Sequence, residues 1–465
     1  MKKILALVLA LVMALSLVAC GKEKDPTADW GPEPEGTIEV EIWTLFGETL
    51  RNQYQKVIDD FNASQTKYHV TCETQGSAAE LNAKLASVSQ EELPAMFHGT
   101  VENVAMYANA DYCVPLQEFI DMEKKGTWKE LDNTWQAILT AYQDQSGSQI
   151  GYPQGYSYGN VFYNKDMFAK AGIDAVNDLK SFEDLYDVCR KLVDGGYTTY
   201  GIGFHPNGVY INTALGREGI MYYDHDNGYS GTIEKCLYTS DSTVNHALKT
   251  MLGVYQKLQS ENLSIPYGTN YQKEIIPQLA DGSCAMMMGV VSMTGKVLTA
   301  VGDNFEVGII PMLSATDAGK RTGEPNGGTG GFICNNGNKW AQKGAYEFIK
   351  FASSADEAGY FASVTGYLAT NTDAYNSEVY QDYVKNTFPD IAVVYESLAK
   401  ADSSARSPYI PISNEMEAAN RAAIQAAASN PDADLDAIIQ KDCDTIQEAI
   451  ELYNLSNNLS NPTSN

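Results

Sequence analysis

The five residues Gly155-Tyr156-Ser157-Tyr158-Gly159 match the pattern G-x-S-x-G, which in many hydrolases presents a serine nucleophile on a sharp turn. The chemistry would be attack of the serine hydroxyl on a carbonyl carbon. It requires a strand before the serine, a helix directly after it, and an acid and a histidine later in the chain. Here the extended apolar run of residues 161–163 follows instead of a helix. The pattern therefore argues against a serine hydrolase.

Other motifs also fail the geometry that their chemistry needs. Residues 224–228 (Asp-His-Asp-Asn-Gly) are similar to a calcium loop, but the glycine comes one place early and Lys235 stands where the bidentate glutamate should be. The glycines of residues 327–331 lack the Lys-Ser or Lys-Thr of a phosphate loop. The five histidines show no metal-ligand spacing, and carboxylates are too numerous to single out a glycosidase pair. We expect no catalytic residue, no metal and no cofactor.

The composition describes a large and acidic globular protein. A chain of 465 residues is too long for one ordinary domain, so two or three are expected. Its formal charge of −27 repels nucleic acid and anionic membrane surfaces, and neither is an expected ligand. A small neutral ligand is fully compatible with this charge.

The N-terminus has the pattern of an export signal. Lys2 and Lys3 precede an uncharged apolar run at residues 4–17, which is too short for a spanning helix. Residues 17–21 (Leu-Val-Ala-Cys-Gly) resemble the lipobox of bacterial lipoproteins, in which the signal is cut before a cysteine that carries diacylglycerol. The resemblance implies a signal peptide at residues 1–19 and a lipid on Cys20. The alternative is an ordinary signal with a chance cysteine.

The polar, Pro- and Gly-rich residues 20–36 are expected to form a flexible tether between the lipid and the domain. Two or more acyl chains would hold the protein stably at the outer face of the cell membrane.

From Thr37 the chain alternates between predicted strands and helices. Ile38, Val40 and Ile42 alternate with polar residues, as in a half-buried strand, and helical spacing follows. A second strand is predicted around Val70, a capping box at residues 77–80, and a third apolar run at residues 94–97. Such alternation predicts an α/β fold with mostly parallel sheets and a ligand crevice beyond their C-terminal strand ends. Residues 43–47, 75–77 and 98–102 are the loops at those ends.

Residues 152–172 are predicted to cross from one sheet to another. Pro153 interrupts a strand, and the run 161–163 resumes an extended pattern. Asn164 is a favourable N-cap for a short helix that Gly172 ends. A crossing of this kind would expose the intervening residues Tyr156, Ser157 and Tyr158 at a site between the two sheets.

This stretch carries a family resemblance. Its pattern Y-P…Y-N-K-D-x-F-x-x-A-G-I is similar to the extracellular solute-binding proteins of bacterial ABC importers, a group that includes maltose- and glycerol-3-phosphate-binding proteins. Further elements match in the family's order at residues 279–286, 305–311, 327–333, 340–352 and 365–368. The resemblance extends from about Ile38 to Tyr453.

The resemblance implies a two-lobed periplasmic-binding-protein fold of type II, with a cleft between the lobes. We expect residues 37–153 with 290–352 to form lobe 1, residues 154–289 with 353–456 to form lobe 2, and residues 457–465 to be a polar tail. Ligand that touches both lobes selects a closed form. The expected partners are the permease subunits of an ABC importer, and the protein itself is expected to be a monomer.

The favoured ligand is a mono- or oligosaccharide, because aromatic rings cover the C–H face of a sugar while polar groups satisfy its hydroxyls. The candidate lining rings and hydroxyl-binding groups are Trp43, Phe46, Thr100, Glu102, Tyr156, Ser157, Tyr158, Asn207, Tyr210, Ser292, Gly328, Thr329, Gly330 and Tyr367.

Two alternatives remain at this point. The first is a glycerol-3-phosphate or glycerophosphodiester ligand, for which the family resemblance implies an arginine just before the C-terminal helices. The matching residues 412–417 hold no arginine and two carboxylates, although Arg406 and Arg421 lie nearby. A buried phosphate needs such a charged partner. The second alternative, a secreted glycoside hydrolase, finds no acid/base pair in the sequence.

Seven cysteines remain after Cys20. An exported protein usually pairs its cysteines, but seven is an odd number and no C-x-x-C motif occurs. Most of the seven fall on apolar positions of predicted strands and helices. The sequence therefore favours buried free thiols over disulfides.

Overall fold

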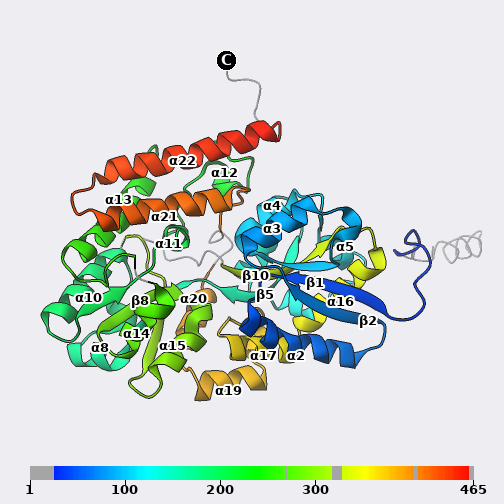
Figure 1. Ribbon diagram of the computed structural model, residues 1–465, viewed down its shortest axis with the longest axis horizontal. Coiled ribbons are helices and arrows are strands. Elements are labelled where there is room, and N and C mark those ends of the chain that lie inside the picture. The colour runs from blue at the N-terminus through cyan, green and yellow to red at the C-terminus, as the bar shows by residue number, and fades with distance from the viewer. Residues whose placement is uncertain (1–25, 269, 317–326, 402–406, 460–465) are drawn as a thin grey trace, which may run out of the picture.

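The computed structural model of the protein describes residues 26–268, 270–316, 327–401 and 407–459. It has two lobes, each built on one β-sheet with helices packed around it (Figure 1). The predicted signal peptide, Cys20, Arg406 and residues 460–465 of the predicted tail lie outside the described residues. Of the described helices, none is both long and apolar enough to span a membrane. The predicted α/β class is confirmed.

The first sheet has six strands. In spatial order they are β2 (Tyr68–Thr74), β1 (Ile38–Thr44), β3 (Met96–Thr100), β10 (Gly327–Cys334) and β4 (Cys113–Val114), with β5 (Gly151–Ser157) also paired to β10. β1 is parallel to β2 and β3, whereas β10 runs antiparallel to β3, β4 and β5.

The second sheet has the order β7 (Tyr200–Gly203), β8 (Cys284–Val290), β6 (Gly159–Asn164) and β9 (Val307–Pro311). Only β7 and β8 are parallel, and β6 runs antiparallel to β8 and β9. Both sheets are therefore mixed rather than mostly parallel as predicted. The physical reason is that β6 and β10 enter their sheets from the other lobe and run against the strands that βαβ units supply.

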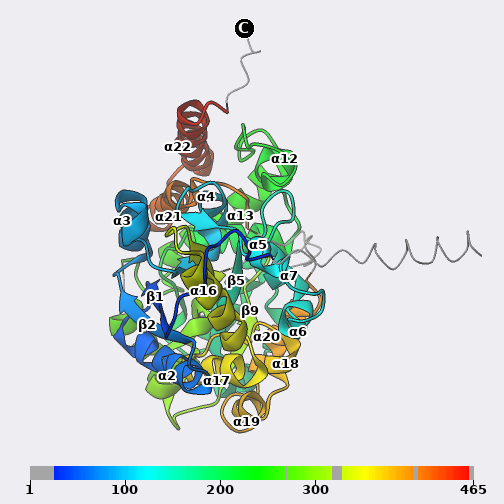
Figure 2. The same ribbon diagram turned by 90° about the vertical axis from the view of Figure 1, so that its right-hand side faces the viewer.

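Helices cover both sheets. Around the first sheet lie α2 (Glu48–Ser64), α3 (Ala78–Ser87), α4 (Val104–Ala108), α5 (Gln117–Ile120), α6 (Lys129–Asp132), α7 (Gln136–Leu139), α16 (Lys339–Ala352) and α17 (Ala355–Thr365). Figure 2 shows α16 in front of the first sheet, where it packs on β1, β5 and β10.

The second lobe holds most of the remaining helices, of which α21 and α22 pack on each other and on α13 (Figure 1). They are α8 (Lys165–Ala171), α9 (Ala175–Asp178), α10 (Phe182–Asp194), α11 (Val209–Arg217), α12 (Asp224–Asn227), α13 (Ser242–Ser260), α14 (Ile276–Ala280), α15 (Thr294–Val301), α20 (Ile391–Leu398), α21 (Ser413–Ser429) and α22 (Leu435–Ser456). α18 (Thr372–Tyr375) and α19 (Glu378–Asn386) pack beside α17.

Local sequence signals set several helix ends. Ser77 and Glu80 form the predicted capping box of α3, and Ser181 caps α10 in the same way. Asn164 accepts a hydrogen bond from the Met167 amide at the start of α8. Gly172 then ends α8 in the left-handed conformation, as predicted.

The predicted crossing is also where the chain changes sheets. β5 of the first sheet ends at Ser157 and β6 of the second begins at Gly159, so Tyr158 alone separates them. β9 belongs to the second sheet, although residues 290–352 were assigned to lobe 1. α17 packs on α2 beside the first sheet, although it falls within the 353–456 assigned to lobe 2. Non-local strand pairing decides both placements, and sequence order does not reveal it.

The N-terminal segment is partly seated on the first lobe. The Trp30 ring packs edge-on against Trp340, with ring centroids 5.3 Å apart, and against Phe119 at 6.0 Å. Glu33 pairs with Lys67. The tether predicted for residues 20–36 is therefore held against the first lobe from Trp30 onward.

Candidate functional site

The strands that cross between the lobes bring the predicted residues of three segments together. Thr329 on β10 pairs with Thr100 at the end of β3 and with Gly155 on β5, and Gly328 pairs with Tyr156. Gly328 has φ +115°, and a Cβ there would lie 2.2 Å from the Gly155 carbonyl oxygen. Only glycine allows this close approach, so the backbone of β10 itself forms one wall of the site.

Two more segments meet the same strands. The Ser292 amide, in the short 3₁₀ helix Val291–Met293, donates a 3.1 Å hydrogen bond to the Ser157 hydroxyl. The Leu368 amide donates to the Tyr156 carbonyl at 2.9 Å. Tyr367 lies in the turn before Leu368; burial raises the pKa of its hydroxyl to about 12, and the nearby Ser292 side chain opposes the rise. Chain segments far apart in sequence therefore converge where the lobes join.

Glu102 is an ionisable group at this junction. It lies half-buried in the 3₁₀ helix Val101–Asn103, and a Cβ on Gly327 would be 3.6 Å from its Oε1. Burial raises the pKa of Glu102 to about 8, and the charge of Glu417 adds to the rise. Hydrogen bonds from the backbone amide of Glu102 and from the Thr100 hydroxyl oppose the rise. A hydrogen-bond donor from a ligand would stabilise the ionised carboxylate.

The charge of Glu102 acts on several tyrosine hydroxyls. Burial is the main cause that raises the pKa of Tyr142, Tyr156 and Tyr367, and the charge of Glu102 is the second cause for each. The pKa of Tyr367 is raised to about 12. Among the described residues, the buried Tyr142 Oη and Thr329 Oγ1 have no hydrogen-bond partner. Buried polar groups are normally satisfied, so these two hydroxyls have capacity for a ligand or a water. Sequence reasoning missed Tyr142, because nothing in its local pattern distinguishes it from a core tyrosine.

The second lobe faces this junction through the start of α21. The Ser413 hydroxyl donates to Asn103 Oδ1 at 2.6 Å, which joins the lobes directly beside Glu102. Glu417, one turn further along, packs against Gly208 and pairs with Arg421 at 2.9 Å. Residues 412–417, which hold no arginine, thus present the carboxylate of Glu417 to the junction. Among the described residues, this carboxylate forms its ion pair with Arg421.

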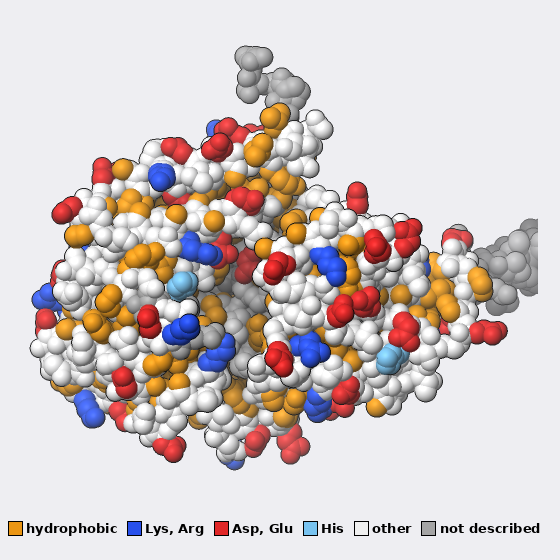
Figure 3. Space-filling model, viewed as in Figure 1, with side chains coloured by type: hydrophobic (Ala, Val, Ile, Leu, Met, Phe, Trp, Pro, Cys, Tyr) orange, Lys and Arg blue, Asp and Glu red, His pale blue; other side chains and the backbone are white. Residues whose placement is uncertain are grey.

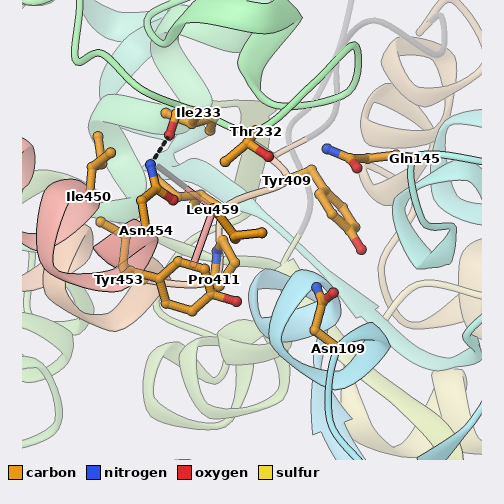
Figure 4. A pocket seen from close by; sticks show the side chains of 12 residues that line it. Asn109, Gln145, Thr232, Ile233, Tyr409, Pro411, Ile450, Tyr453, Asn454 and Leu459 are labelled. Atoms are coloured by element: carbon orange, nitrogen blue, oxygen red, sulfur yellow. Dashed lines mark hydrogen bonds between the residues drawn. The ribbon is translucent and has the colours of Figure 1, made fainter. Parts of the chain in front are cut away.

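A hollow separates the two lobes on the molecular surface (Figure 3). The lobes also touch through Gln145, whose Nε2 donates to the carbonyl oxygens of Gly228 and of Gly231, the latter at 3.1 Å. A cavity of about 170 Å³ lies next to this contact, between Tyr409, Asn109 and the α22 residues Tyr453 and Asn454 (Figure 4).

Phe46 lies in the core of the first lobe rather than at this junction. It is fully buried, stacks on the His98 ring at 4.4 Å and packs on Tyr54 and Phe361. His98 Nε2 donates to Gln154 Oε1 at 2.8 Å, and burial lowers the pKa of His98 to about 4. The predicted loop at residues 98–102 therefore contributes Thr100 and Glu102 to the site but not His98.

Trp43 is covered by its own lobe. Its exposed fraction is 4%, Lys84 Nζ lies 3.9 Å above the ring, and its Nε1 donates to Glu41 at 2.8 Å. The contact with Lys84 is a cation–π interaction. Trp43 therefore stabilises the packing of α3 on β1.

The remaining predicted residues are also engaged inside the protein. Tyr158 donates to the Val394 carbonyl at 3.2 Å, and Tyr210 to the Met288 carbonyl at 3.4 Å; both rings are buried. Asn207 accepts from the Val209 amide at the start of α11. Of the six predicted lining rings, Tyr367 alone keeps a partly exposed surface.

The structure also locates the G-x-S-x-G pattern and the calcium-like loop that the sequence analysis rejects. Ser157 of the G-x-S-x-G pattern lies at the end of β5 and is followed by the strand β6, as the sequence indicated. Asp224, His225 and Glu234 come within 4.8 Å of one another, but Asp224 Oδ1 already accepts the amides of Glu234 and Lys235.

Comparisons with known proteins identify relatives. A family model for bacterial extracellular solute-binding proteins matches residues 56–388. The sn-glycerol-3-phosphate-binding periplasmic protein UgpB of Rhizobium meliloti is 22% identical over 350 residues, covering 74% of this chain and 77% of UgpB.

Two solved structures show the same fold. One is the sugar-binding protein MalE of Xanthomonas citri, with a TM-score of 0.75 and 13% identity, covering 91% of this chain and all of that chain. The other is UgpB of Mycobacterium tuberculosis in complex with glycerophosphocholine, with a TM-score of 0.70 and 15% identity over 90% of this chain and 100% of that one.

Proposed function

The chain belongs to the bacterial extracellular solute-binding proteins, and we propose that its ligand is a neutral carbohydrate, bound at the junction of the two lobes. As in its family, it is a binding protein rather than an enzyme, and it acts outside the cytoplasm with the permease of an ABC importer. The choice of carbohydrate, the residues that contact it and the lipid anchor are parts of the proposal.

The observation that carries the proposal is the chemistry around Glu102. Among the described residues, its own backbone amide and the Thr100 hydroxyl hydrogen-bond to Glu102, and its charge acts on Glu417 and on the hydroxyls of Tyr142, Tyr156 and Tyr367. A sugar hydroxyl donates to a carboxylate and accepts from tyrosine and threonine hydroxyls. A phosphate here would meet the Glu417 carboxylate and, above about pH 8, an ionised Glu102 as well, and bringing negative charges together in a partly buried site costs free energy.

The roles of the proposed residues follow from the partly exposed ring of Tyr367 and from the buried, unpartnered hydroxyls of Tyr142 and Thr329. Tyr367 offers one ring face, because its other face stacks on Phe361 with an interplanar angle of 13°. The partly exposed face can cover the C–H groups of a sugar ring. Glu102, Tyr142 and Thr329 would bind hydroxyls, and ligand that also reaches Glu417 on α21 would favour the closed arrangement of the lobes.

The relatives support an alternative ligand. UgpB is named for glycerol 3-phosphate, and a described arginine, Arg421, lies on α21 within one turn of Glu417. If a phosphate ester is the ligand, Arg406 or Arg421 would pair with the phosphate, and Arg421 would have to exchange Glu417 for it, since a buried phosphate needs a charge-assisted partner.

A thermal-shift panel distinguishes the two ligands. We expect at least one of maltose, maltotriose, raffinose and cellobiose to raise the melting temperature saturably, and glycerol 3-phosphate and glycerophosphocholine to leave it unchanged. A ligand at a hundredfold excess over its Kd adds about 2.7 kcal/mol to the free energy of unfolding. A saturable shift with glycerol 3-phosphate that Arg421→Ala abolishes would establish the phosphate alternative. The matched control is Arg190→Ala, in an exposed ion pair on α10.

The lipid anchor has its own test. Cys20→Ala should move the protein from the membrane fraction to the soluble fraction, because the acyl chains that Cys20 would carry are the proposed attachment. Cys72→Ala, the matched control at a cysteine inside the first lobe, should stay with the membrane. Fractionation followed by a carbonate wash measures both. Retention of Cys20→Ala after the wash would contradict the lipobox interpretation.

A further inference from the structure

One face of α22 is fastened to the chain segment that precedes α13. Asn454 Nδ2 donates to the Ile233 carbonyl at 2.8 Å, as the dashed line in Figure 4 shows. Two turns earlier, Gln447 Nε2 donates to the Glu234 carbonyl at 2.9 Å, and Gln447 Oε1 accepts from the Cys236 amide at 3.0 Å. The helix and the segment therefore run side by side in a fixed register.

This register places two cysteines together. Cys443 lies one helical turn before Gln447 and thus on the same face of α22. Its Sγ is 3.7 Å from the Cys236 carbonyl oxygen and 3.7 Å from Thr239 Oγ1. Both cysteines are buried, each with an exposed fraction of 6%, and both are free thiols in the structure.

The two thiols also interact with each other. A hydrogen bond from Cys236 is the largest cause that lowers the pKa of Cys443 to about 6, with further support from Thr239. Burial raises the pKa of Cys236, and the contact with Cys443 adds to the rise. The two thiols are therefore close enough to influence each other's ionisation.

We propose that Cys236 and Cys443 form a disulfide when the exported chain folds in the presence of an organic disulfide as oxidant. The Cys443 thiolate attacks one sulfur of that oxidant, which releases a thiolate and leaves a mixed disulfide on Cys443. Cys236 then loses its proton and its sulfur displaces the second thiolate. The two protein thiols are oxidised to one disulfide, and one oxidant disulfide is reduced to two thiols.

The odd number of cysteines does not oppose this pairing. One bond between Cys236 and Cys443 leaves the other cysteines as the thiols that the sequence favours. The bond would fix α22 to the body of the second lobe. It would also stabilise the folded protein, because it cross-links two residues that lie far apart in the chain and so restricts the unfolded state. This inference does not depend on which ligand the protein binds.

Refolding in a glutathione mixture tests the proposal. The full mature chain is unfolded in urea and refolded with reduced and oxidised glutathione, because both thiols are buried in the folded protein. Free thiols are then blocked with iodoacetamide in urea, which makes buried thiols accessible, before digestion with trypsin. Trypsin cuts after Lys235 and Lys441, so the bond would join peptide 236–249 to peptide 442–465. We expect mass spectrometry to find this linked pair in most molecules, and dithiothreitol to separate it.

Matched variants make the result specific. Cys443→Ser should abolish the linked peptide, whereas Cys72→Ser should retain it. The oxidised protein should also melt about 3–8 °C above the reduced one, a difference that is absent in Cys443→Ser. Carbamidomethyl groups on both Cys236 and Cys443 after oxidative refolding to a native circular dichroism spectrum would overturn the proposal. Separate glutathione adducts on each cysteine would overturn it equally.

Discussion

Replacing Phe46 with alanine should lower the free energy of unfolding by about 3–5 kcal/mol, the usual result of deleting a fully buried phenylalanine. The ring fills a site between His98, Tyr54 and Phe361, and the variant leaves a cavity there. The backbone around it is also fixed, since the Phe46 amide donates to Thr44 Oγ1 at 3.0 Å. The surrounding groups therefore have little freedom to fill the space.

Urea denaturation measures this effect, and ligand affinity of the folded fraction should change less than about twofold. Phe305→Ala removes the same side chain from a half-buried position and should cost about 1 kcal/mol. The sequence instead predicts Phe46 as a ligand-lining ring. A large loss of affinity with unchanged stability would show that prediction to be right and the packing role to be minor.

Replacing Glu102 with alanine should weaken binding of the sugar by about 10- to 100-fold, because hydrogen bonds to a charged group contribute about 1.5–3 kcal/mol. The loss follows from the position of Glu102 among Tyr142, Tyr156 and Tyr367 at the lobe junction. Isothermal titration with the sugar that gives the largest thermal shift measures it. Glu73→Ala, an exposed carboxylate on β2, is the control. Unchanged affinity in Glu102→Ala would place the ligand elsewhere.

The pH dependence of stability checks the same carboxyl group. The pKa of Glu102 is raised in the folded protein to about 8, so the folded state holds this proton more tightly than the unfolded state. The associated stability is fully present below about pH 4.5 and is lost as the pH rises through about 8. Glu102→Gln stays neutral and escapes the loss. At pH 9 the glutamine variant should therefore unfold at a higher temperature than the natural protein, whereas at pH 4 the two should be equal.

Local signals in the sequence predicted local structure well. The caps at Ser77 and Asn164 depend on residues three positions apart, and both are confirmed. The crossing at residues 152–163 was also recognisable, because an interrupted strand followed by a new one is visible in a single stretch. The family and the two-lobed fold followed from the order of such stretches.

The site itself depends on contacts that the sequence does not display. Trp43 was predicted to meet ligand, but Lys84 on the following helix covers its ring. Tyr142 carries a buried hydroxyl near Glu102, yet the run around it is typical of a core helix. The sequence places β9 in lobe 1, whereas β9 pairs with β6 in the second sheet. The two strands lie far apart in the chain, so their pairing is not visible in the sequence. In each case a partner distant in sequence decides what the side chain does.

The packing of Trp30 on the first lobe limits the distance between the protein and a membrane. With Cys20 lipidated as proposed, the residues between Cys20 and Trp30 would link the lipid to the first lobe, and fully extended they would span at most about 35 Å. That reach is comparable to the diameter of one small domain. Because Trp30 packs on Phe119 and Trp340, this linker would end on the first lobe. The second lobe would then be the one that moves relative to the anchored first lobe. Capture of ligand would then take place within one molecular diameter of the bilayer, with the first lobe held and the second closing onto it.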